Sequence, residues 1–213
     1  MVQIGVWERE EGVAGAVEAA LAAAGRAGLR LLTGAHPAAL AGEALSLLTV
    51  SPGAVGWAGA GAIACRTVLL PGSAGPLARH LKADRAVSYG PSPKDSITLS
   101  SLEGDQICVA LQRELVTVTG RVLERQELVL PFPTGRDPLP WLAVTGTLLL
   151  LDVPPEELWR GYGKKHGPAG VTGGPALWEP WKGGAGRTGT RPALRGKMRK
   201  AGQFWTESLR SNK

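Results

Sequence analysis

Two loops near the middle of the chain combine glycines, hydroxyl groups and a lysine, and each follows an apolar segment. The residues that would contact a ligand there are Gly72, Ser73, Gly75, Ser88, Tyr89, Ser92, Lys94 and Ser96. Backbone N–H groups beside glycines, together with hydroxyl and ammonium groups, are the donors that bind phosphate and carboxylate groups in proteins. The chemistry that these residue types favour is therefore the binding of a small anionic ligand.

Two strands must lie side by side for these loops to meet. Residues 67–70 form a short apolar run that stops at a Pro-Gly pair, which is typical of a strand buried on both faces. A short helix is expected through residues 77–82, with Pro76 at its first position, Ser73 or Gly75 as its cap and Lys82 in its last turn. Residues 86–89 form the next strand. The pattern predicts a strand, a crossover helix and a parallel strand, which brings both loops to the carboxyl edge of one sheet.

The same stretch also has a purely structural interpretation, which we weigh above the ligand-binding one. Pro-Gly-Ser-Ala-Gly-Pro is an ordinary connection from a strand to a helix. Serine and threonine alternating with Ile97, Leu99 and Leu102 are typical of a half-exposed strand. The two interpretations differ in whether the loops line a common concave surface.

The first ninety residues alternate between strand-like and helix-like patterns. Strands are predicted over residues 2–7, 29–32 and 45–50, and a helix over residues 13–26. This alternation predicts an α/β fold with a small, doubly wound, Rossmann-like and mainly parallel sheet. Residues 8–12 lack G-x-G-x-x-G and hold glutamates, and G-x-x-x-x-G-K-[ST] is missing, so no nucleotide or other cofactor is predicted.

From about residue 95 the apolar pattern changes to a period of two. Residues 107–111, 115–119 and 122–130 are strand-like and are separated by short turns. They predict an antiparallel β extension that continues the parallel sheet at one edge. The α/β domain with this extension is expected to span residues 1–133.

Residues 134–213 are predicted to be a Gly/Pro/Trp-rich basic tail that is irregular and disordered. From residue 154 onward the chain has twelve Lys/Arg and four Asp/Glu, so the net charge of +6 arises in the tail. Cations interleaved with aromatic rings suit single-stranded nucleic acid, although a solvated basic tail is the commoner case. The alternative function is nucleic-acid association through Arg187, Arg191, Arg195, Lys197, Arg199, Lys200 and Trp205.

Motifs for catalysis and metal binding are missing from the sequence. The three histidines lie far apart, and H-E-x-x-H, G-x-S-x-G and C-x-x-C do not occur, so no metal is predicted. A third hypothesis is an enzyme that uses Lys94, Asp95 and Ser96 as an acid/base and nucleophile group. It ranks last because neighbouring residues of a strand point to opposite sides. The sequence leaves open whether the chain is an enzyme and what its oligomeric state is.

The two cysteines, Cys65 and Cys108, lie in apolar surroundings and are expected to be free thiols. The chain does not open with a basic region and an apolar signal core. Residues 44–65 are too rich in glycine to span a membrane, and residues 139–151 are too few. We therefore expect a soluble, cytoplasmic protein without a membrane partner.

Ser88, Tyr89 and Gly90, followed by Asp95 and a run of strands, resemble the exit of the central domain of Mur ligases. In those enzymes a strand that ends in Tyr-Gly precedes an aspartate and β-rich sequence. The resemblance covers a short stretch, and the nucleotide-binding loop that Mur ligases need is missing from this chain. We therefore carry over no residue role from it.

Overall fold

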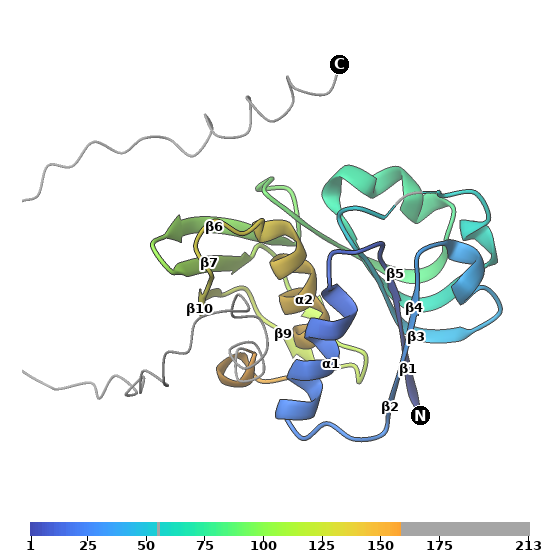
Figure 1. Cartoon of the computed structure of the whole chain (residues 1–213), viewed down its shortest axis with the longest axis horizontal. Coiled ribbons are helices and arrows are strands. Elements are labelled where there is room, and N and C mark those ends of the chain that lie inside the picture. The colour runs from blue at the N-terminus through green and yellow to red at the C-terminus, as the bar shows by residue number, and fades with distance from the viewer. Residues whose placement is uncertain (55, 159–213) are drawn as a thin grey trace, which may run out of the picture. The chain divides into compact units, whose positions relative to one another are not determined.

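The computed structural model describes residues 1–54 and 56–158. Within this part of the chain, eight strands form one sheet and two short strands form a separate ribbon (Figure 1). The strands of the sheet are β1 (Val2–Trp7), β2 (Leu29–Gly34), β3 (Ala44–Val50), β4 (Ala64–Pro71), β5 (Lys82–Gly90), β6 (Ile97–Glu103), β7 (Gln106–Leu111) and β10 (Glu127–Pro131). The ribbon pairs β8 (Leu115–Val116) with β9 (Val122–Leu123).

The helical elements comprise two α-helices and four short 3-10 segments within the described residues. They are α1 (Val13–Ala23), α2 (Pro138–Leu150), η1 (Pro37–Leu40), η2 (Ala60–Ala62), η3 (Gly72–Arg79) and η4 (Pro155–Glu157).

The predicted fold class is confirmed by the strand pairing. The strands follow the order β10-β7-β6-β5-β4-β3-β1-β2, and all pairs from β2 to β6 are parallel. β7 is antiparallel to β6, and β10 is antiparallel to β7, so the antiparallel extension continues the sheet at one edge. Leu69 of β4 lies opposite Val87 of β5. The loops that follow these two strands therefore leave the sheet at the same edge.

The crossovers cover the two faces of the sheet unequally. The step from β1 to β2 uses α1, and the steps from β2 to β5 run in the opposite direction along the sheet through η1, η2 and η3. Right-handed crossovers that run in opposite directions lie on opposite faces. Leu40, Ala60 and Leu77 of the 3-10 segments accordingly share one core cluster, and the α1 residues belong to another. This topology leaves the α1 face of the central strands without a crossover helix.

Helix α2 covers that remaining face. It contacts β3, β4, β5 and β6 and packs beside α1, as the two adjacent helices in Figure 1 show. Every residue from 141 to 150 is buried. A helix that is apolar on all sides is expected where it is enclosed by a sheet, a second helix and the β extension.

The prediction of irregular structure from residue 134 is wrong for residues 138–150. Asp137 caps α2 because its Oδ1 accepts a hydrogen bond of 2.9 Å from the N–H of Leu139. Pro138 and Pro140 lie in the first turn, where backbone N–H groups have no partner inside the helix. Two prolines that suggest a break thus mark the start of the helix. The remainder of the predicted tail, residues 159–213, lies outside the described residues.

A glycine allows α2 to lie close to the sheet. A β-carbon on Gly146 would lie 2.8 Å from Cδ1 of Ile97 and 2.9 Å from Cδ2 of Leu69. At the next residue, the hydroxyl of Thr147 donates to the carbonyl of Ala143 at 2.7 Å and lies 2.7 Å from the hydroxyl of Thr49 on β3. The helix is therefore joined to the sheet by close packing and by one buried polar pair.

The crossover between β4 and β5 differs from the predicted helix over residues 77–82. Here η3 begins at Gly72 with Pro71 as its cap, in place of Ser73 or Gly75, and Lys82 opens β5. Ala74 has φ −95° and ψ 18°, which interrupts the helical backbone and leaves two short turns. The predicted strand over residues 122–130 also divides, since β9 and β10 belong to different sheets.

The described helices include none that is long and apolar enough to cross a membrane.

Candidate functional site

The structure brings the two predicted loops together at the carboxyl edge of β4 and β5. Pro71 at the end of β4 pairs with Tyr89 near the end of β5. The next strand, β6, begins beside the end of β5, because only Tyr89 with Ile97 and Gly90 with Thr98 are paired. Parallel neighbours normally require a long crossover. Residues 91–96 instead fold back over the edge of the sheet, toward the start of η3.

Asp95 joins the two loops. Its side chain is buried, with 5% of the residue exposed. A β-carbon on Gly72 would lie 2.8 Å from Cγ of Asp95, and one on Gly90 would lie 2.6 Å from its Oδ2. The N–H of Ser92 donates to Oδ2 at 3.3 Å. A carboxylate of the chain itself therefore occupies the position between the loops where we expected the anionic group of a ligand.

Two of the predicted ligand residues, Tyr89 and Ser96, are buried, and Ser88 is half-buried. Tyr89 is fully buried, and its hydroxyl donates to the carbonyl of Val50 at 2.7 Å, so it is a core residue. Burial, with Glu11 and Asp137 nearby, raises the pKa of Tyr89 well above its usual range. The N–H of buried Ser96 donates to the hydroxyl of half-buried Ser88 at 3.1 Å. The inclusion of Tyr89 among the ligand contacts is thus wrong, because its hydroxyl is already used in the core.

The other predicted residues lie on the outer side of the loops. Gly72, Ser73, Gly75 and Lys94 are exposed, and Ser92 is partly buried with its hydroxyl accepting from the N–H of Lys94 at 3.2 Å. The guanidinium of Arg113 donates to the carbonyl of Lys94 at 2.7 Å, which adds a second cation. Sequence analysis missed Arg113 because it follows β7, far along the chain.

The N-terminus of α1 also holds a carboxylate of the chain. Glu8 accepts hydrogen bonds from the N–H groups of Val13 at 2.7 Å and Ala14 at 3.1 Å. In dinucleotide-binding sheets a pyrophosphate lies against such N–H groups. Glu8 thus satisfies the donors that this kind of ligand would use.

A third carboxylate lies where the strand order reverses, between β1 and β3. Oε1 of Glu11 accepts from the hydroxyl of Ser51 at 2.8 Å and from the N–H of Gly53 at 2.5 Å. Burial raises the pKa of Glu11, but hydrogen bonds from Ser51 and from backbone N–H groups outweigh it and lower the pKa below its ordinary value. Ligands of open α/β sheets usually bind in the crevice at this point. Here the hydrogen bonds of Glu11 connect the segment after β1 to the segment after β3 across that crevice.

The described residues offer little for covalent or metal chemistry. Among residues 1–54 and 56–158, no group of three or more His, Cys, Asp or Glu side chains could hold a metal ion. Burial, with Asp84 nearby, raises the pKa of the free Cys65 thiol to about 12, and burial also raises the pKa of Cys108. Both cysteines are therefore protonated thiols at neutral pH, which are poor nucleophiles.

The structure does not bring the side chains of residues 94–96 together, as the enzyme hypothesis requires. Lys94 is exposed, whereas Asp95 faces Gly72 and Gly90 and Ser96 is buried. The predicted nucleic-acid residues, Arg187, Arg191, Arg195, Lys197, Arg199, Lys200 and Trp205, lie outside the described residues.

Comparisons with known proteins give a likeness of fold. No family model matches the chain, and no curated protein matches it. A solved structure that is similar, the crystal structure I of MurF from Acinetobacter baumannii, has 10% sequence identity and a TM-score of 0.48. The match covers 79% of this chain and 46% of that chain, so this chain spans less than half the length of the MurF chain. At this level the likeness carries no argument about function.

Proposed function

We propose that the chain binds a small anionic ligand on the outer side of the joined β4 and β5 loops. The observation that carries the proposal is the convergence of these loops on Asp95, with Ser73 and Lys94 exposed around it. Arg113 is held at the same loop by its hydrogen bond to the carbonyl of Lys94. A hydroxyl and two cationic side chains form the donor set for a phosphate or carboxylate group.

Asp95 limits how deeply such an anion enters. Its carboxylate lies between Gly72 and Gly90 and repels a second negative charge. The ligand therefore stays in contact with solvent, outside the glycines, and binds weakly. Replacing this carboxylate with a neutral amide of the same shape is expected to strengthen anion binding by about tenfold, or roughly 1.4 kcal/mol.

The test is a titration of the full chain with inorganic phosphate and with pyrophosphate at low ionic strength. Binding is measured by calorimetry and by the change in melting temperature. We expect saturable binding that is lost in the Ser73→Ala, Lys94→Met double variant and is strengthened by Asp95→Asn. Lys82→Met is the matched control, because Lys82 is an exposed lysine at the opposite end of β5. If the parent protein shows no binding, or if Lys82→Met weakens it as much as the double variant does, the proposal is wrong.

The alternative proposal, nucleic-acid association through the basic tail, is supported by the excess of Lys/Arg after residue 154. Deletion of residues 159–213 is expected to abolish salt-sensitive retention of single-stranded DNA, because such binding depends on cation–phosphate contacts. Phosphate binding at the β4 and β5 loops would persist in the deletion variant. The free thiols of Cys65 and Cys108 support the cytoplasmic location that belongs to both proposals.

A further inference from the structure

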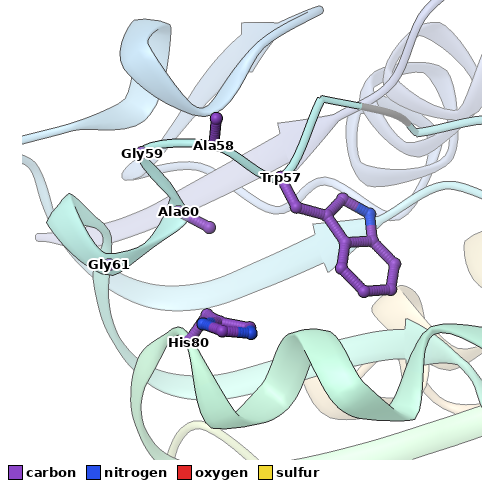
Figure 2. A pocket seen from close by; sticks show the side chains of 6 residues that line it. All are labelled: Trp57, Ala58, Gly59, Ala60, Gly61 and His80. Carbon is purple, nitrogen blue, oxygen red and sulfur yellow. The ribbon is translucent and has the colours of Figure 1, made fainter.

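A cavity of about 370 Å³ lies between the connection from β3 to β4 and the end of η3 (Figure 2). It is lined by Trp57, Ala58, Gly59, Ala60, Gly61 and His80. These residues precede β4 and β5, so the cavity belongs to the amino ends of these strands. None of them belongs to the loops of the proposed anion site. Its volume falls within the range typical of small-molecule sites, but it is open to solvent on one side and would leave much of a ligand exposed.

Backbone hydrogen bonds hold the two walls of the cavity. The N–H of Ile63 donates to the carbonyl of Ala60 at 2.9 Å, and the N–H of His80 donates to the carbonyl of Leu77 at 2.9 Å. The two walls are joined where the N–H of Lys82 donates to the carbonyl of Ile63 at 3.1 Å. Ala60 is completely buried and anchors the loop to the core. The cavity is therefore part of the folded sheet and its connections.

Glycines keep the cavity open. A β-carbon on Gly61 would lie 3.3 Å from the carbonyl oxygen of His80, so a larger residue there would crowd the opposite wall. Gly59 has φ +84°, a left-handed conformation that other residues rarely adopt. The loop consequently presents backbone between Trp57 and His80, with no side chain larger than a methyl group.

The two large side chains differ in chemistry. Trp57 exposes 37% of its surface, so part of its indole is accessible to a ligand. Figure 2 shows its indole and the imidazole of His80 projecting from different segments around the same space. His80 is exposed, and the cationic residues Arg79 and Lys82 beside it in the chain are exposed too. The cavity therefore combines the aromatic surface of Trp57 with the imidazole of His80 as a hydrogen-bond donor.

We propose that this cavity binds a small planar aromatic ligand that carries an anionic group. The ring packs on the indole of Trp57, since aromatic rings favour offset or edge-on contact with one another. The anionic group lies beside His80, whose imidazole has an N–H donor in either protonation state. This site shares no residue with the anion site at the β4 and β5 loops, so either one can exist without the other.

The experiment is calorimetric titration of the full chain with 2-naphthoate, which combines both features. Acetate and 2-naphthylmethanol are the matched probes, because each lacks one of the two features. We expect 2-naphthoate to bind more tightly than either. Trp57→Ala should weaken its binding by about tenfold, the loss of one good aromatic contact, and Trp57→Phe should restore most of it. His80→Ala should weaken binding of 2-naphthoate and leave that of 2-naphthylmethanol unchanged.

Melting temperatures of all variants provide the folding control, and exposed Trp57 and His80 are expected to be replaceable without unfolding. Equal binding of 2-naphthoate by the parent protein and by Trp57→Ala would overturn the proposal, as would no binding by the parent protein. The Ser73→Ala, Lys94→Met variant separates the two sites. It should bind 2-naphthoate like the parent protein, and a loss there would assign the binding to the β4 and β5 loops instead.

Discussion

The carboxylate of Asp95 lies against the α-carbon of Gly72, so that a β-carbon on this glycine would be 2.8 Å from Cγ of the aspartate. These residues come from the loops after β5 and β4, which meet only because the two strands are parallel neighbours. Together with Glu8 and Glu11 of the connection between β1 and α1, Asp95 places three carboxylates of the chain in the loops at the carboxyl edge. Sheets that bind nucleotides use such loops for phosphate groups.

Gly72→Ala is expected to destabilise the protein by about 1–3 kcal/mol, because the new methyl group must displace a buried carboxylate. Gly75→Ala is the matched control in the same loop, since a β-carbon there would contact nothing within 4 Å. It should change the free energy of unfolding by less than about 1 kcal/mol. Urea unfolding of both variants measures the difference, and equal effects would mean that Asp95 does not occupy the position described.

Gly146→Ala tests the close approach of α2 to the sheet. Alanine favours a helix by up to about 1 kcal/mol over glycine, but its methyl group would press on Ile97 and Leu69, which costs about 1–3 kcal/mol. We expect a net loss of stability in urea unfolding. Gly15→Ala in α1 has no atom within 4 Å of the new β-carbon and should stabilise the protein. Stabilisation by both substitutions would contradict the packing of α2.

Thr147→Val tests the buried hydroxyl pair between α2 and β3. Because Thr147 donates to Ala143, Thr49 must donate to Thr147, and removal of the Thr147 hydroxyl leaves Thr49 buried without an acceptor. The expected loss is about 1–3 kcal/mol. Thr49→Val should cost less, since Thr147 keeps its bond to Ala143. A double-mutant cycle by urea unfolding checks this order, and purely additive effects would argue against the pair.

The hydrogen bonds of Glu11 predict a pH dependence of stability. Its folded-state pKa is lowered from the ordinary value of 4.5. A carboxyl group of this kind stabilises the fold fully above the unfolded pKa, and the contribution is lost as the pH falls through the folded pKa. Glu11→Gln should therefore lose less stability than the parent protein when the pH falls below 4.5. Glu18→Gln, at an exposed position of α1, should follow the parent curve in urea titrations at each pH.

Apolar patterning predicted the core of the fold because the signal is local. The apolar runs over residues 45–50 and 67–70 correspond to β3 and β4, and the change to a period of two after residue 95 corresponds to the antiparallel extension. The convergence of the loops after β4 and β5 follows from parallel neighbours, so it was predictable as well. Helix α2 was not predictable in this way, because Pro138 and Pro140 suggest a break in regular structure. In the structure both prolines lie in the first turn of the helix.

The sequence alone determined most of the strands and the two loops that meet at the carboxyl edge, since apolar runs and turn residues are local signals. Only the tertiary structure decided what fills that edge and what covers the sheet. Asp95 contacts Gly72 because the pairing of β5 with β6 sets the path of the loop between these strands. Helix α2 covers the face of the central strands that has no crossover helix. Trp57 and His80 likewise meet across connections to different strands. Such contacts depend on the relative positions of distant segments, which local sequence patterns do not encode.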